Sequence, residues 1–207
     1  MQFQLFEAIH IKPPLEEIYR RLGYRNGITE VSSLKQKELD SYISEASGLI
    51  DLKGSSRRLE IHKKDGWFIY ISRDSRFESK LLASLLKECK AMLCMGVTAG
   101  RRIIEAIGAL RESNLTKGVV FDAVASEMVD AGFDWIQGYT RQELLRENKQ
   151  LTAKRISCGY GDFNLDNQRQ LYRLLELDKF GVSLTQSLML VPEKTATAVA
   201  GIMEITR

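Results

Sequence analysis

The stretch LTAKRISCGYGDFNLDNQRQLYRLLELDKFGVSLTQSLMLVPEKTATAVAGIMEI, residues 151–205, gives the clearest indication of fold class in this 207-residue chain. A glycine-containing turn comes first, and a short amphipathic helix over 167–184 follows it. Two strand-like segments then lie on either side of Val191-Pro192-Glu193-Lys194. Because helices and strands come in clusters, without strict β-α-β alternation, the sequence predicts an α+β fold with a mostly antiparallel sheet.

Helical spacing of apolar residues continues upstream of this stretch. It predicts helices over 15–24, 34–48, 79–90, 100–114 and 116–148. Pro13 and Pro14 suit the first turn of the first helix, because proline lacks only an N–H that would have no partner there, and Gly23 suits its end. Gly132 and Gly138 are candidate positions for a bend or a break in the last and longest helix.

Three further segments are expected to contain strands. Apolar residues alternate weakly over 3–11, and the apolar run 90–100 has the length of a strand. Asp65-Gly66 is a hairpin-turn signal between two strands within 57–71. Gly54-Ser55-Ser56, which precedes that hairpin, is expected to be a loop.

The composition is that of a soluble globular protein, with 44% apolar and 28% charged residues. Thirty basic residues against 27 acidic ones leave a net charge of only +3, so we expect neither a nucleic acid nor a membrane as the main partner. The N-terminus has no signal-peptide pattern, and no run of about 18 apolar residues could cross a bilayer. We therefore expect a cytoplasmic protein.

Cysteine and histidine usage argues against a disulfide framework and against a metal site. The three cysteines, Cys89, Cys94 and Cys158, are odd in number and lack metal-ligand spacing. The two histidines, His10 and His62, stand in no ligand pattern. We expect reduced thiols and no metal-binding residues.

Two other features are interpreted as structural rather than as anion sites. Arg57, Arg58, Lys63 and Lys64 form a basic cluster, which is typical of a solvated strand face. Thr98-Ala99-Gly100 precedes a helix whose free N–H groups would attract an anion, but Arg101-Arg102 follows where a phosphate-binding loop would have Gly-Lys-Ser or Gly-Lys-Thr.

The segment RISCGYGD, residues 155–162, has the strongest chemical character in the chain. Gly159 lets backbone approach a ligand closely, Arg155 can hold a carboxylate through two hydrogen bonds, and Tyr160 offers a flat apolar face with a hydroxyl. Those are the needs of a site for a small zwitterion that carries an aromatic base. The alternative is an ordinary tight turn with a surface arginine.

The C-terminal half of the chain also resembles a known family, the activation (reactivation) domain of cobalamin-dependent methionine synthase, and in particular its stand-alone form. The likeness is strongest over 90–202, and it implies that 1–207 is a single unit of this kind. The matching blocks, in chain order, are Thr98-Ala99-Gly100, Asp122-Ala123, Arg155, Ser157, Gly159, Tyr160, Leu174-Leu175, Gly181–Ser187, Pro192 and Gly201.

The resemblance implies a curved, mostly antiparallel sheet with flanking helices and a shallow groove for S-adenosylmethionine. It assigns the cofactor-binding positions to Arg155, Ser157, Gly159 and Tyr160. Arg155 would hold the carboxylate of the methionine part or a nearby oxygen, Ser157 would meet the adenine through its backbone, Gly159 would give room, and Tyr160 would shape the wall. It implies no catalytic side chain, because the sulfonium is already an activated methyl donor.

Two positions depart from the family pattern. Cys158 stands where the family usually has proline, which makes the turn less rigid. The family's acidic residue near the start of the domain is replaced by His10, within Ile9-His10-Ile11-Lys12-Pro13. The carboxylate contact to the ligand ammonium is therefore missing or made by another residue.

The family likeness leads to a specific expectation of function. The chain would bind S-adenosylmethionine and support reductive remethylation of cobalamin held by a separate methionine synthase subunit, acting in trans as a component and not as a complete enzyme. A flavodoxin- or ferredoxin-type protein would supply the electron. Two alternatives stay open: a partner-binding scaffold of that complex that has lost ligand binding, and a reactivator of another corrinoid methyltransferase.

Overall fold

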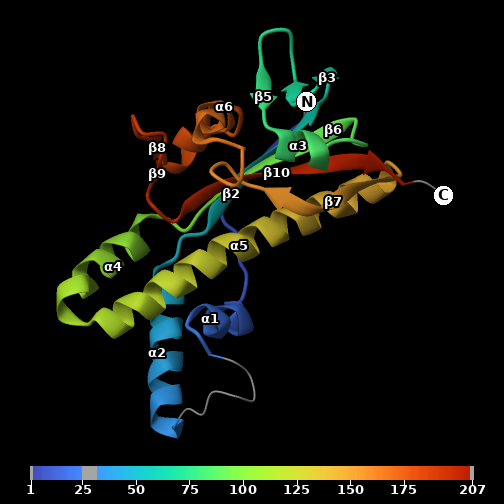
Figure 1. The fold of residues 1–207 in the computed structure, drawn as a ribbon. Coiled ribbons are helices and arrows are strands. Elements are labelled where there is room, and N and C mark those ends of the chain that lie inside the picture. The colour runs from blue at the N-terminus through green and yellow to red at the C-terminus, as the bar shows by residue number, and fades with distance from the viewer. Residues whose placement is uncertain (1, 25–31, 206–207) are drawn as a thin grey trace.

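A computed structural model describes residues 2–24 and 32–205, and its centre is a five-stranded antiparallel sheet with helices on both faces (Figure 1). The strand order is β1-β2-β6-β10-β7, and every neighbouring pair is antiparallel. The strands are β1 (Gln2–Phe6), β2 (Lys53–Glu60), β6 (Ala91–Thr98), β10 (Thr195–Glu204) and β7 (Lys149–Ile156). The predicted α+β class is confirmed.

The central strand β6 has the apolar run that the sequence shows because both of its faces are covered. Leu93 and Met95 lie in the core on one side, and Met92 and Cys94 lie in the core on the other. Neighbouring side chains of a strand point to opposite faces, so a strand buried on both sides carries few polar residues. The sheet thus separates two hydrophobic cores.

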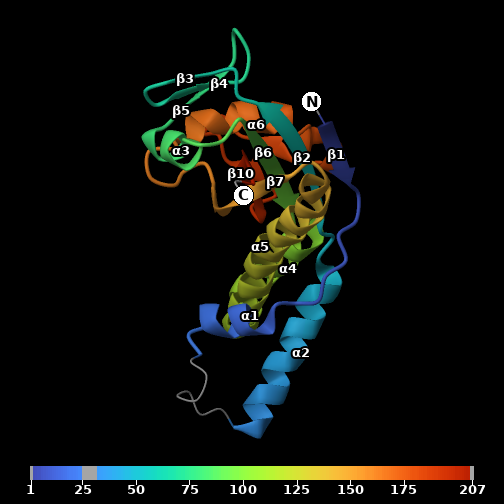
Figure 2. The same ribbon diagram turned by 90° about the vertical axis from the view of Figure 1, so that its right-hand side faces the viewer.

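Four helices cover the first face. They are α1 (Leu15–Arg21), α2 (Ser33–Leu49), α4 (Arg101–Ser113) and α5 (Leu115–Arg146). Figure 2 shows that α2, α4 and the first half of α5 extend well beyond the sheet. Helix α5 runs without a break through Gly132 and Gly138. Gly132 is needed for packing instead, because a Cβ there would lie 2.8 Å from Val97 Cγ1.

The second face is covered by shorter elements. The predicted helix over 79–90 is only α3 (Lys80–Leu85), and beyond its end the carbonyls of Leu86, Lys87 and Cys89 accept hydrogen bonds from the Lys64 ammonium. The predicted helix over 167–184 is divided into η1 (Leu165–Asn167), α6 (Gln168–Leu174) and η2 (Leu177–Phe180). Two small sheets complete this face, and their strands are β3 (Lys63–Asp65), β4 (Phe68–Tyr70), β5 (Arg76–Glu78), β8 (Ser183–Leu184) and β9 (Leu190–Val191).

One strand prediction and one loop prediction need correction. The strand predicted over 3–11 ends at Phe6. Gly54-Ser55-Ser56 is not a loop, because it lies inside β2, where it pairs with both β1 and β6. Small residues are required there, since a Cβ on Gly54 would lie 2.7 Å from the carbonyl oxygen of Gly96. The Asp65-Gly66 hairpin is confirmed, between β3 and β4.

The basic cluster is used within the fold. Arg57 pairs with Glu176 at 2.6 Å, Arg58 pairs with Glu147 at 2.7 Å, and Lys63 pairs with Asp65 at 2.8 Å. Arg57 and Arg58 are mostly covered, with side chains 19% and 16% exposed, so they differ from the solvated face that the sequence indicated. Among the described helices, none combines the length and the apolar character needed to cross a membrane.

Candidate functional site

A groove of about 800 Å³ lies along the end of β7 and the turn that follows it. Strand β7 is at the edge of the five-stranded sheet, so one row of its backbone N–H and C=O groups has no partner strand. Helix α3 forms the opposite wall. The residues that line the groove are Leu81, Ser84 and Leu85 from α3, and Lys154, Arg155, Ile156, Ser157 and Tyr160 from β7 and its turn.

The turn after β7 is closed by its own backbone. Gly159 N–H donates to the Phe163 carbonyl at 2.7 Å, and Tyr160 N–H donates to the Ser157 carbonyl at 3.2 Å. Gly159 has φ of +86°, a conformation that side chains other than glycine rarely adopt. The turn leaves Tyr160 69% exposed at the groove. An exposed aromatic ring beside open backbone groups can hold a planar heterocycle.

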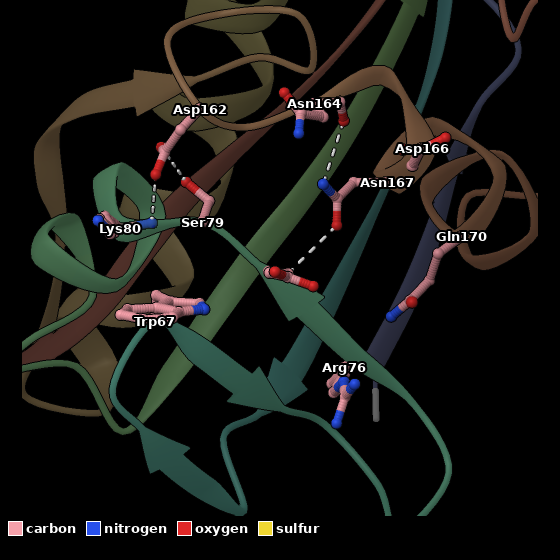
Figure 3. Close-up of a pocket in the computed structure, with 10 residues that line it drawn as sticks. Trp67, Arg76, Ser79, Lys80, Asp162, Asn164, Asp166, Asn167 and Gln170 are labelled. Carbon is pink, nitrogen blue, oxygen red and sulfur yellow. Dashed lines mark hydrogen bonds between the residues drawn. The ribbon is translucent and has the colours of Figure 1, made fainter.

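Asp162 fixes this turn to α3 (Figure 3). Its carboxylate accepts hydrogen bonds from Ser79 Oγ at 2.8 Å, Lys80 N–H at 2.7 Å and Leu81 N–H at 3.1 Å. The same hydrogen bonds hold the pKa of Asp162 below its usual value, the Ser79 hydroxyl having the largest effect. Asp162 therefore sets the distance between the two walls of the groove.

Replacing Asp162 with asparagine should lower the melting temperature at pH 7, because an NH₂ group would face either the Lys80 N–H or the Leu81 N–H. A carboxyl group whose folded-state pKa is lowered stabilises the fold above its unfolded pKa, and this stabilisation is lost as the pH falls through the folded value. The difference between wild type and Asp162→Asn should thus shrink below about pH 4.

Thermal unfolding between pH 3 and pH 7 checks this expectation. Asp166→Asn is the matched control, because no hydrogen bond to the Asp166 side chain is present in the described part of the chain, and it should change the melting temperature little. Equal melting temperatures for wild type and Asp162→Asn at pH 7 would show that Asp162 does not hold the turn.

Arg155 lines the groove, but its guanidinium is bonded to α5. Nη1 donates to the Asp134 carboxylate and to Gln137 Oε1, and Nη2 donates to the Asp130 carbonyl at 3.3 Å. The guanidinium carbon also lies 5.3 Å from the centre of the Phe133 ring. This direction follows from the register, because Arg155 pairs with Ala200, whose side chain faces the same core as α5.

The two departures from the family pattern have different places in the fold. Cys158 lies in the turn, where burial raises the pKa of its thiol to about 12, so the thiol stays protonated at neutral pH. His10 lines another cavity, of about 410 Å³, together with Asp51 and Met128. The structure therefore does not bring His10 to the groove.

The structure brings Arg155, Ser157 and Tyr160 to one groove, with Gly159 in the turn between them. Sequence reasoning did not find the α3 wall, or the α5 residues that hold Arg155. Helical periodicity predicted both helices, but it contains no information about which turn each one contacts. Over residues 2–24 and 32–205, no cluster of three or more His, Cys, Asp or Glu side chains could hold a metal ion.

Comparison with known proteins identifies the fold. No protein-family model matches this chain, and no curated protein matches it. Among solved structures, the chain is similar to the crystal structure of the MetH reactivation domain bound to AdoHcy, with a TM-score of 0.70. The match covers 100% of this chain and 80% of that chain at 16% sequence identity. At this identity, the comparison shows that the two share a fold.

Proposed function

We propose that this protein binds S-adenosylmethionine in the groove between β7 and α3 and serves as a reactivation module for a cobalamin-dependent methyltransferase. The observation that carries the proposal is the fold match over the whole chain with a domain that holds AdoHcy, together with a groove at a turn whose residues suit such a ligand. S-adenosylmethionine and AdoHcy share the adenosine and the amino-acid end.

The lining of the groove suits an amphipathic nucleoside. Leu81 and Leu85 offer an apolar surface to adenine, and Tyr160 offers an exposed ring to its face. The edge of β7 presents backbone donors and acceptors to the rim of the base, and Ser157 adds a hydroxyl. Most of these contacts depend on backbone and shape, which fits the low sequence identity of the structural match.

The charged end of the ligand would meet Arg155 and the carboxylates beside it. Asp134 is 70% exposed even though it bonds to Arg155, so it retains free acceptor capacity. In this arrangement Asp134 offers the ligand ammonium the contact that His10 does not supply. The Arg155 guanidinium would give up some of its hydrogen bonds to α5 and donate to the ligand carboxylate instead.

The protein's contribution to methyl transfer would be positioning. The sulfonium of S-adenosylmethionine needs no base or nucleophile from the chain, so the groove has only to hold the methyl group toward the acceptor. Cobalamin on a separate subunit would supply the strongly nucleophilic cobalt, and a flavodoxin- or ferredoxin-type donor would supply the electron. This chain would act in trans on that subunit.

Isothermal titration with AdoHcy, which cannot transfer a methyl group, tests the proposal. We expect saturable binding, and about 10-fold weaker binding after Tyr160→Ala, because stacking on an aromatic ring is worth about 1–3 kcal/mol. Met189→Ala is the control, since Met189 is 54% exposed and lies outside the groove. Absence of heat, both alone and with a cobalamin-binding methionine synthase subunit, would contradict the proposal.

A second candidate is a scaffold that keeps the fold and binds the cobalamin subunit without any ligand. The observation in its favour is that the Arg155 guanidinium is already held by Asp134 and Gln137. Binding to the subunit that is unchanged by AdoHcy and by Arg155→Ala would favour the scaffold.

A further inference from the structure

A second cavity, of about 640 Å³, shares no lining residue with the groove. It lies between the small sheet β3-β4-β5, the start of α3 and the segment that leads into α6 (Figure 3). Figure 3 shows Trp67, Ser79, Arg76 and Gln170 on different sides of the cavity opening, with the end of β5 between them. The cavity therefore has several walls, built from parts of the chain that are far apart in sequence.

Five charged residues line this cavity: Arg76, Glu78, Lys80, Asp162 and Asp166. The Lys80 ammonium lies over the Trp67 ring, and the Asp162 carboxylate accepts hydrogen bonds from Ser79, Lys80 and Leu81. Arg76 and Glu78 are both exposed and lie two residues apart on β5, so they project from the same face, roughly 7 Å apart. In the described part of the chain, neither forms an ion pair with the other or with any third residue. The Arg76 guanidinium lies 4.4 Å from the centre of the Phe68 ring and donates to the Tyr70 hydroxyl at 3.4 Å, so it is held in place but its charge is not neutralised by a carboxylate.

Gln170 adds an unsatisfied hydrogen-bond donor. Its Nε2 is buried and has no acceptor among the described residues. Figure 3 shows the Gln170 side chain directed toward the opening, on the side where Arg76 lies. A buried donor without an acceptor is unfavourable, and an oxygen of a bound molecule would satisfy it.

Trp67 supplies an apolar surface on the other side of the opening. It occupies the two-residue turn between β3 and β4 and is 45% exposed. The Lys80 ammonium lies 5.0 Å from the centre of the indole ring, which fixes the ring through a cation–π contact. The cavity thus combines the Arg76 cation, the Glu78 carboxylate, a Gln170 amide without an acceptor, and the flat apolar ring of Trp67.

We infer that this cavity binds a free α-amino acid that has an apolar side chain. Arg76 and the Gln170 amide would hold the carboxylate, Glu78 would hold the ammonium, and Trp67 would pack against the side chain. A zwitterion satisfies both charges at once, whereas a simple anion or cation leaves one of them unpaired. The inference does not depend on the proposed function, because the two cavities are lined by different residues.

Fluorescence offers a direct test, because the chain has two tryptophans, Trp67 and Trp135. Trp135→Phe leaves Trp67 as the single reporter and preserves an aromatic ring against Phe6 and Tyr139. L-leucine, L-methionine and L-phenylalanine are titrated in turn, and we expect at least one to change the emission in a saturable way. No change with all three, and no heat by calorimetry, would overturn the inference.

Blocked ligands and charge variants test the zwitterion itself. The N-acetyl and the carboxamide derivatives of the binding amino acid each lack one charge, and each should bind about 10-fold more weakly or worse. Arg76→Gln and Glu78→Gln should weaken binding of the free amino acid similarly. Arg73→Gln is the matched control, since Arg73 is exposed nearby but does not line the cavity. Equal binding of the blocked derivatives would contradict the inference, even if a variant failed to fold.

Discussion

Phe163→Ala should lower the free energy of unfolding by about 3–5 kcal/mol, the usual cost of removing a fully buried aromatic ring. Phe163 is 0% exposed and packs edge-on against Phe77, with ring centres 6.0 Å apart. Its backbone also closes the turn, accepting from Gly159 N–H at 2.7 Å and donating to the Tyr160 carbonyl at 3.1 Å. Its ring therefore anchors the proposed ligand-binding turn in the core.

Urea unfolding at pH 7 measures this loss, and Leu165→Ala is the control. Leu165 lies two residues further on and is 36% exposed, so its truncation should cost less than about 1 kcal/mol. The folded Phe163→Ala protein should also bind AdoHcy more weakly, because the turn has lost its anchor. Equal losses of stability for the two variants would show that the ring does not anchor the turn.

Gly54→Ala should destabilise the protein by about 1–3 kcal/mol, although it adds only one methyl group. The added Cβ would lie 2.7 Å from the Gly96 carbonyl oxygen and 3.0 Å from Ile136 Cδ1. The first of these neighbours is backbone of the adjacent central strand, so the clash cannot be relieved by a side-chain rotation. Strands β2 and β6 would have to separate.

Gly138→Ala makes the matched comparison for this substitution. Gly138 lies inside α5, and a Cβ there would have no heavy atom within 4 Å. Alanine should therefore stabilise the helix by up to about 1 kcal/mol. By urea unfolding, we expect Gly54→Ala to lower the free energy of unfolding and Gly138→Ala to raise it. A stabilising effect of Gly54→Ala would contradict the packing described for the sheet.

The fold class could be predicted because, in the main elements, the spacing of apolar residues in the sequence matches the side chains that the fold buries. The apolar run in β6 and the helical spacing in α5 are visible because each element is covered along its length. Gly54-Ser55-Ser56 was misinterpreted as a loop because small residues indicate turns by composition. In the fold they are needed where β2 passes close to β6 and α6, as the 2.7 Å hydrogen bond from Ser55 Oγ to the Leu175 carbonyl shows.

The sequence singles out the turn at 155–162 as a candidate site, but it does not show what surrounds that turn. Gly159 and Tyr160 have local properties that a sequence displays directly. The α3 wall and the carboxylates beside Arg155 come from segments about 70 and 20 residues earlier, which only the folded sheet brings to the edge of β7. The sequence also could not show that the Arg155 side chain points to α5, because its direction depends on the register of β7 against β10.

A crystal structure of this protein with AdoHcy tests directly whether adenosyl compounds bind between Tyr160 and α3. We expect density for the adenine against Tyr160 and Leu81, with the amino-acid end near Arg155 and Asp134. Density confined to another cavity, or an empty groove at a saturating concentration of AdoHcy, would show that this groove is not the adenosyl site.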